Sequence, residues 1–230
     1  MGGLGTAIAR ASKIVKRLSI DPTGGPLDLL CLGAHSDDIE IGSGGTILRL
    51  LAEHPGSTVR WVVFATTSER AQEAERAAAL ALADAAERTV QLLEFEDSYF
   101  PGQVREIKDV FEKLKTEVEP DLILTHTAND AHQDHRTISE LTWNTFRNHL
   151  VLEYEIPKYD GDLGRPGLFV ALSRSQAERK IELLLNAFGS QKERHWFDPE
   201  VFRGLLRLRG VECRAADGYA EAFYCRKVVL

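Results

Sequence analysis

The stretch "LGAHSDDIEIGSGGT", residues 32–46, combines one histidine, three acidic residues and four glycines at the end of an apolar run. The residues that lead into it, "LDLLCLGA" at 27–34, are typical of a buried β-strand. The residues at its end and beyond, "SGGTILRLLAEH" at 43–54, have the apolar spacing of a helix. A buried strand followed by a charged loop and a helix predicts the first part of a β-α-β unit.

The same alternation of strand and helix continues along the chain. Regular alternation implies a parallel sheet with helices on both faces, so we predict a Rossmann-like three-layer α/β sandwich with a mostly parallel sheet. Beyond residue 150 the pattern loosens, which predicts a more irregular C-terminal α/β region. Further strands are predicted over 58–67, 89–95, 120–127, 168–173 and 219–228. Further helices are predicted over 68–87, 102–118 and 137–147, and two more lie between the last two strands.

Composition and punctuation predict one domain preceded by a short arm. With 230 residues, 43% of them hydrophobic, the chain suits a single domain with a sizeable core. The turn-forming "DPTGGP" at 21–26 separates an N-terminal arm, 1–25, from this domain, 26–230. Basic residues among apolar ones in the arm indicate either an amphipathic helix that lies on a membrane or partner, or a solvated extra helix.

Charge and cysteine content exclude several classes of protein. The net charge of −7 gives no basic surface for phosphates, so no nucleic-acid partner is expected. Cys31, Cys213 and Cys225 have no C-x-x-C spacing, which favours reduced thiols and a cytoplasmic location. No apolar run is long enough to cross a membrane, and no signal peptide is expected. The aromatic segments "YFPG" and "HWFDPEVF" are candidates for a sugar site or for a subunit contact in a homo-oligomer.

The two most polar and histidine-rich loops follow two strands that we expect to be neighbours. The first strand ends at "AHSDD", and the fourth strand ends at "THTANDAHQDH". In a doubly wound sheet the chain reverses direction between these strands, and the crevice outside their carboxyl ends binds ligands. Both loops are therefore predicted to face one crevice.

These loops carry side chains suited to zinc. A catalytic zinc ion takes three protein ligands and leaves a position for water, and His35, Asp38 and His135 can fill this role, with His132 close by. Two adjacent ionised aspartates are costly to bury unless a cation offsets their charge. With Asp38 on the metal, Asp37 is free to act as a general base.

Other interpretations of the same residues remain open. An aspartate pair after a strand also serves as an N-cap and a first-turn acid, and H-x-x-H also occurs at ordinary helix starts. Gly42, Gly44 and Gly45 do not form a dinucleotide loop, because Ile47 occupies the third glycine position; close packing of the helix against the sheet is expected instead. His126 suits either the pocket lining or a structural role.

Two motifs resemble those of the PIG-L/LmbE-like zinc N-deacetylases. "AHSDDIEIGSGGT" is similar to the family signature A-H-P-D-D-x-E-x-G-x-G-G-T, and "PDLILTHTANDAHQDHR" is similar to P-D-x-(V/I)-x-T-H-x-x-x-D-x-H-x-D-H-R. Weaker similarity at Arg70-x-x-Glu73 and at "YAEAF" extends the resemblance over residues 27–226. It implies a Rossmann-like fold and an enzyme that removes acyl groups, usually acetyl, from amino sugars and their glycosides.

The resemblance also implies individual roles. It makes Asp37 the general base and His132 a protonated group beside the developing oxyanion, with Asp134 holding and charging it. It places Arg70 and Asp97 at positions that contact sugar hydroxyls. The zinc ligands that it implies are His35, Asp38 and His135.

Two departures from the family pattern concern the substrate. Ser36 replaces a proline, and "TTSER" after the second strand lacks the usual glycine-acid loop that helps to frame the sugar. The expected function is removal of the N-acetyl group from an N-acetyl amino sugar or its glycoside in a biosynthetic pathway, with Zn²⁺ as cofactor. The alternatives are a zinc amidase for a non-sugar N-acyl substrate and a non-catalytic nucleotide- or sugar-binding module. The second alternative has no use for His132 and His135 together.

Overall fold

The strands form one twisted sheet in the computed structural model, which describes residues 18–21 and 23–229. Most of the predicted N-terminal arm, residues 1–17, lies outside the described residues. The strands are β1 (Asp28–Gly33), β2 (Thr58–Val63), β3 (Glu87–Leu92), β4 (Leu122–His126), β5 (Leu150–Tyr154), β6 (Leu168–Leu172) and β7 (Tyr219–Tyr224). Their order across the sheet is β3-β2-β1-β4-β5-β7-β6.

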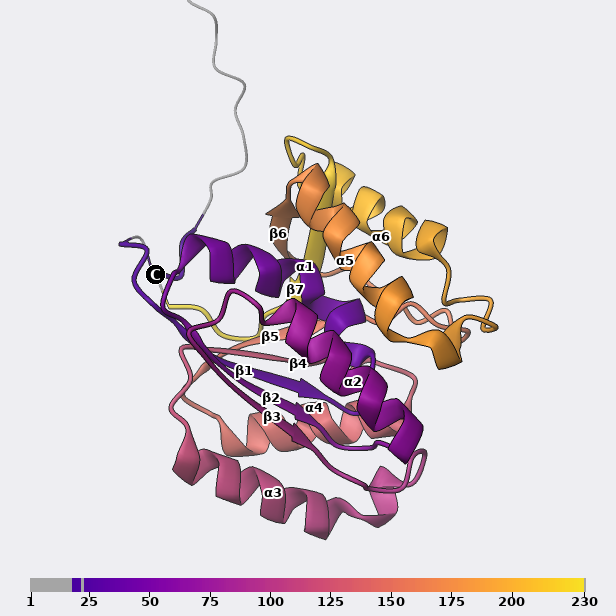
Figure 1. The fold of residues 1–230 in the computed structure, drawn as a ribbon. Helices are drawn as coiled ribbons and strands as arrows, with labels where there is room; N and C mark the ends of the chain where they lie inside the picture. The colour runs from indigo at the N-terminus through magenta and orange to yellow at the C-terminus, as the bar shows by residue number, and fades with distance from the viewer. Residues whose placement is uncertain (1–17, 22, 230) are drawn as a thin grey trace, which may run out of the picture.

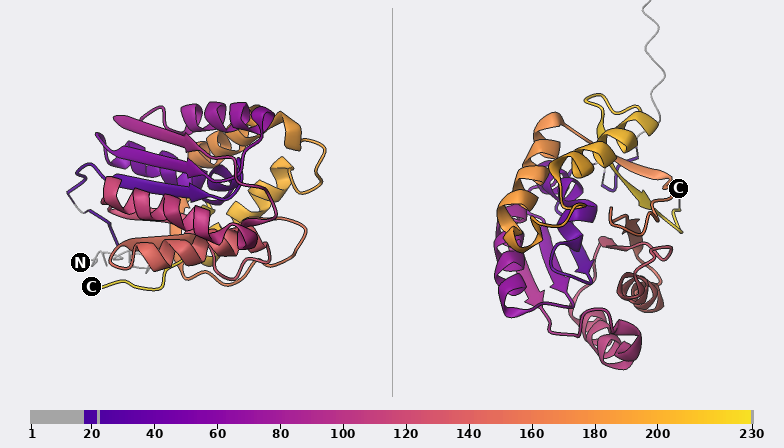
Figure 2. Two further views of the ribbon diagram at one scale, coloured as in Figure 1. Left: turned by 90° about the horizontal axis from the view of Figure 1, so that it is seen from below. Right: turned by 90° about the vertical axis from the view of Figure 1, so that its right-hand side faces the viewer.

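Helices cover both faces of this sheet, as Figure 1 shows and the turned views of Figure 2 agree. One face carries α1, α2, α5 and α6, and the other carries α3 and α4. None of the described helices is long and apolar enough to cross a membrane. The helices are α1 (Asp38–Glu53), α2 (Ser68–Ala81), α3 (Val104–Glu117), α4 (Gln133–Thr145), α5 (Arg174–Ala187) and α6 (Pro199–Glu212), with 3₁₀ turns η1 (Phe100–Gly102) and η2 (Gly189–Gln191).

The predicted parallel sheet is confirmed. Strands β1 to β5 pair in parallel, whereas β7 runs antiparallel to both of its neighbours, β5 and β6. β1 lies between β2 and β4, with Cys31 opposite Leu124 in the β4 register. After β3 the chain crosses to the other side of β1 and forms β4 there. The loops after β1 and β4 therefore begin at the same edge of the sheet.

The core lies on both sides of β1, which is why this strand is a continuous apolar run. Leu29 and Cys31 belong to the cluster beneath α1, while Leu30 and Leu32 belong to the cluster beneath α3 and α4. All four side chains are at most 2% exposed. Alternate residues of one strand therefore anchor two opposite helix layers, which gives the functional loops a rigid base.

Two helices begin earlier than the sequence pattern predicts. α1 begins at Asp38 instead of residue 43, and α4 begins at Gln133 instead of residue 137. The reason is that polar residues form the first turn of each helix, with Asp37 and His132 at the N-cap positions. Asp38 and His135 thus lie in helical first turns, whose backbone holds them more rigidly than a loop. At the other end, α2 stops at Ala81, before the predicted residue 87.

Two of the three glycines of α1 pack against the sheet as expected, whereas Gly44 faces Lys180 of α5 at ordinary contact distance. A Cβ atom on Gly42 would lie 2.2 Å from the ring of Tyr154 on β5, and one on Gly45 would lie 2.4 Å from Leu172 on β6. Only a residue without a side chain lets the helix approach the sheet this closely. The glycines therefore position the helix whose first turn carries Asp38.

Candidate metal centre

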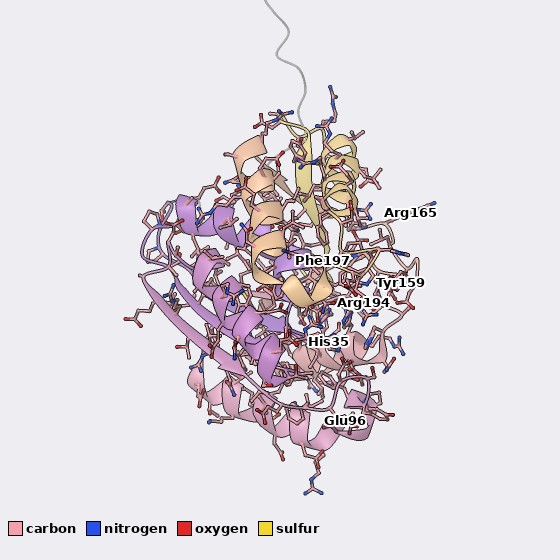
Figure 3. The ribbon with its side chains drawn as sticks, turned by 45° about the vertical axis from the view of Figure 1, so that its right-hand side comes forward. His35, Glu96, Tyr159, Arg165, Arg194 and Phe197 are labelled. Atoms are coloured by element: carbon pink, nitrogen blue, oxygen red, sulfur yellow. The ribbon has the colours of Figure 1, made fainter. Side chains whose placement is uncertain are left out.

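The loops after β1 and β4 meet, as predicted, and bring two histidine rings together. His35 follows β1, and His135 lies in the first turn of α4. The Nδ1 atom of His35 lies 3.2 Å from the Nε2 atom of His135. Figure 3 labels His35 at the end of the sheet.

Asp38 completes a tripod of donor atoms. Its Oδ2 atom lies 3.4 Å from His35 Nδ1 and 3.5 Å from His135 Nε2. Two ligands held about 2.05 Å from a tetrahedral zinc ion lie about 3.3 Å apart. The three separations of this tripod are close to that value, and its donors are two imidazole nitrogens and one carboxylate oxygen. The residues therefore fit a zinc ion by both spacing and chemistry.

The far nitrogen of each ligand ring is held by a carboxylate. His35 Nε2 lies 3.2 Å from Asp134 Oδ2, and His135 Nδ1 lies 2.9 Å from Asp130 Oδ2. Such outer partners fix the tautomer and orientation of ligating histidines. Our sequence interpretation did not single out Asp130, although its position five residues before His135 in the second motif is a signal that could have found it.

The partners of Asp134 differ from those that the resemblance implies. Its carboxylate accepts the N–H groups of Ser98 at 2.6 Å and Phe100 at 3.1 Å, in addition to its contact with His35. The ring of His132 instead uses Nδ1 to accept the backbone N–H of Asp134 at 3.3 Å. Burial and the charge of His35 lower the pKa of His132. The structure thus associates the Asp134 carboxylate mainly with a ligand, His35.

Asp37 has one bound and one free carboxylate oxygen. Arg70 donates from Nη2 to Oδ1 at 2.7 Å, and Oδ2 is buried without a hydrogen-bond partner. Burial raises the pKa of Asp37, against the lowering by Arg70. Although Asp37 occupies the N-cap position, its side chain makes no capping hydrogen bond. The N-cap interpretation therefore does not account for Asp37, and the free oxygen suits a proton acceptor.

The two predicted substrate contacts adjoin different residues of the site. Arg70, on α2, is turned toward Asp37 in this structure. Asp97 is 65% exposed in its side chain, with Oδ1 3.2 Å from His35 Nε2. Asp97 therefore lies at the solvent-exposed side of His35, while Arg70 lies beside Asp37.

His126 has mainly a structural environment. It is fully buried, and its Nε2 accepts the N–H of Ala34 at 3.0 Å. Tyr154 donates its hydroxyl to the carbonyl of Leu32 at 2.6 Å, with its oxygen 3.3 Å from the same ring nitrogen. These contacts brace the end of β1. His126 Nε2 also lies 3.2 Å from Asp38 Oδ2, so it adjoins the tripod.

The electrostatics of the site favour a positive charge. Burial lowers the pKa of His35, but the charge of Asp38 and hydrogen bonds to Asp134, Asp38 and Asp97 outweigh it and raise this pKa well above its ordinary value. The N-terminal ends of α1 and α4 help to keep Asp38 and Asp134, in their first turns, ionised. Buried carboxylates that raise the pKa of a histidine in this way are stabilised by a proton or a metal ion.

One comparison with known proteins found a matching family. A family model described as PIG-L, GlcNAc-PI de-N-acetylase, matches residues 30–146. A comparison with curated protein sequences found no match.

Among solved structures, a conserved protein of Thermus thermophilus has a TM-score of 0.68 at 21% identity, over 89% of this chain and 96% of that one. The N,N'-diacetylchitobiose deacetylase of Pyrococcus horikoshii has a TM-score of 0.64 at 18% identity, over 86% of this chain and 83% of that one. The 4-carboxy-2-hydroxymuconate hydratase of Pseudomonas putida has a TM-score of 0.68 at 18% identity, over 89% of this chain and 98% of that one.

The structural neighbours include a hydratase and a deacetylase, so the shared fold does not by itself select a reaction. The family match is more specific, because it covers half of the chain and contains both loops of the tripod. The chain belongs to the PIG-L family.

Proposed function

We propose that the protein is a zinc-dependent N-deacetylase that acts on an N-acetyl amino sugar or its glycoside. The observation that carries this proposal is the tripod of His35 Nδ1, His135 Nε2 and Asp38 Oδ2, with separations of 3.2–3.5 Å, beside the free oxygen of Asp37. A tripod leaves a zinc ion open to water and substrate. The description of the family, GlcNAc-PI de-N-acetylase, supports both the reaction and the class of sugar.

When bound, zinc would lower the pKa of its water to about 7 and polarise the amide carbonyl. Asp37 Oδ2 accepts a proton from the attacking water, and Arg70 keeps the other oxygen of this carboxylate occupied. The same Asp37 proton then leaves with the amine. Water adds to the carbonyl carbon and the C–N bond breaks, so the products are acetate and a free amine.

His132 is proposed to stabilise the oxyanion. Its Nδ1 accepts a backbone N–H, so the ring proton of a neutral imidazole lies on Nε2, where it is available to a substrate oxygen. The T-shaped contact between the rings of His35 and His132, with centroids 4.9 Å apart, keeps His132 beside the tripod. The N-terminus of α4 supports negative charge at the same place.

Two features support a role of Asp97 in substrate binding. Its carboxylate is exposed, and it adjoins the tripod through His35. A carboxylate at the mouth of the site can accept two sugar hydroxyls. Arg70 is proposed to contact the substrate only secondarily, since its Nη2 is already committed to Asp37.

The test is zinc-dependent acetate release from N-acetylglucosamine glycosides, nucleotide sugars, free N-acetyl sugars and N-acetyl amino acids. Chelated protein is the control, and zinc is restored afterwards. We expect release from a glycoside that stops with chelation and returns with zinc. Release from the amino acids alone would overturn the sugar assignment. Protein that holds one zinc ion and hydrolyses none of these amides would overturn the proposed reaction.

A further inference from the structure

The loop after β5 contacts the candidate metal centre through a lysine. Lys158 Nζ lies 3.0 Å from Asp130 Oδ1 and 2.5 Å from Asp162 Oδ2. The side chains are 10%, 1% and 14% exposed, respectively, so this is a largely buried three-membered cluster. Lys158 and Asp162 lie beyond residue 146, outside the segment that the family model matches.

The cluster is connected to a metal ligand through Asp130. One oxygen of this carboxylate accepts from His135 Nδ1 at 2.9 Å, and the other accepts the backbone N–H of His132 at 2.8 Å. Lys158 therefore contacts the same carboxylate that orients His135. The direction of His135 Nε2 toward the tripod depends on where Asp130 is held.

The side chain of Asp162 binds the backbone of the loop that contains Asp130. Its Oδ2 accepts the N–H of Ala131 at 2.6 Å, next to Asp130 in the chain. Lys158 thus lies between two carboxylates. That of Asp130 contacts His135, and that of Asp162 binds the backbone of the loop before His135. If its positive charge were removed, Asp130 and Asp162 would repel one another across a mostly buried space.

We propose that Lys158 is a positioning residue for the metal, which holds Asp130 against His135 and so keeps His135 Nε2 directed into the tripod. This inference rests on the proposed zinc site but not on the identity of the substrate. Outer-shell partners of zinc ligands typically contribute about 10- to 100-fold to metal affinity. Lys158 acts one contact further out, so its contribution belongs at the lower end of that range.

The experiment measures zinc affinity by competition with a chromogenic chelator, using purified full-length apoprotein and no substrate. We expect Lys158→Met to weaken zinc binding about tenfold and Asp130→Asn to weaken it by about 10- to 100-fold. Lys158→Arg keeps the charge and is expected to restore most of the affinity. Lys113→Met is the control, because Lys113 is exposed and pairs with Glu117 on its own helix, α3, at 3.6 Å.

The melting temperature of each apoprotein separates positioning from a general structural role. Lys158→Met is expected to lower the melting temperature, because it leaves two buried carboxylates without their cation. Leu114→Ala, which removes a buried side chain on α3, gives a destabilised comparison variant. Zinc binding in Lys158→Met that is weaker than in Leu114→Ala supports the inference. Wild-type affinity in Lys158→Met, or a loss no larger than that of Leu114→Ala, overturns it. If Lys158→Met does not fold, Asp162→Asn takes its place, with a smaller loss of affinity expected. A wild-type protein that binds no zinc would instead overturn the proposed function itself.

Discussion

The part of the chain from β1 to α4 and the part from β5 to the C-terminus differ in how they contribute to the site. The first part supplies the tripod and Asp37, from the loops and helical first turns that follow the parallel strands β1 and β4. The second part contains the antiparallel β6–β7 edge and supplies charged side chains that reach into the first part. The tripod and Asp37 thus come from the regular half, and several side chains that contact their surroundings come from the irregular one.

One buried ion pair illustrates this division. Lys180, on α5, pairs with Glu221, on β7, at 2.5 Å, and donates to the carbonyl of Ile41 in α1. Glu221 accepts the N–H groups of Gly45 and Thr46 at 2.9 and 2.6 Å. Two elements of the C-terminal part therefore bind backbone groups within the helix that begins with Asp38. The position of α1 therefore depends on residues more than a hundred positions away in the chain.

The largest expected effect is that of Asp37→Asn on turnover. The amide keeps the size of the side chain and the contact with Arg70 but cannot take a proton, so kcat is expected to fall by about 10²- to 10⁴-fold. Zinc content, measured by atomic emission, is expected to stay at one ion. Asp84→Asn, an exposed position three residues after the end of α2, serves as the control. Retained turnover in Asp37→Asn would falsify the assignment of the base.

The next effect is on stability and probes the C-terminal part. Lys180→Met leaves the buried carboxylate of Glu221 without its cation, and breaking a buried pair in this way costs about 3–5 kcal/mol. The measurement is the free energy of unfolding from urea titration. Arg179→Met removes a neighbouring but half-exposed pair with Asp84 and is expected to cost less than about 1 kcal/mol. Equal losses from the two variants contradict a special role for the buried pair.

Arg70 tests whether the N-terminal half also contains positioning groups. Loss of its hydrogen bond to Asp37 in Arg70→Met is expected to lower kcat about tenfold, since a hydrogen bond to a charged group contributes about 1.5–3 kcal/mol. A residue that binds substrate alone would raise KM and leave kcat unchanged. Steady-state kinetics on the active glycoside distinguish these results, with Arg70→Lys as the variant that keeps the charge.

The last comparison concerns one glycine from each part. Gly42→Ala places a methyl group against the ring of Tyr154 and is expected to destabilise the protein by about 1–3 kcal/mol. Gly204→Ala, on the exposed side of α6, meets nothing within 4 Å and is expected to stabilise by about 0.5–1 kcal/mol. Thermal unfolding of both variants gives the signs. Stabilisation by Gly42→Ala is incompatible with the close approach of α1 to β5.

The sequence by itself determined the parallel sheet, the neighbouring positions of β1 and β4, and the meeting of His35, Asp38 and His135. These features follow from local information, because the alternation of apolar residues sets strands and helices, and the handedness of β-α-β crossovers then restricts their order. The same local information misplaced the starts of α1 and α4, since polar ligand residues interrupt the apolar pattern in a first turn.

Only the tertiary structure decided which carboxylate holds which ring. Asp134 is two residues from His132 in the chain, yet its carboxylate contacts His35, 99 positions away. Arg70 proved to contact Asp37, and Lys158 contacts Asp130 from a loop that no motif marks. The physical reason is that side-chain pairing depends on packing between remote elements, where burial makes a paired charge favourable and an unpaired one costly. Spacing along the chain does not determine which of these remote side chains pair.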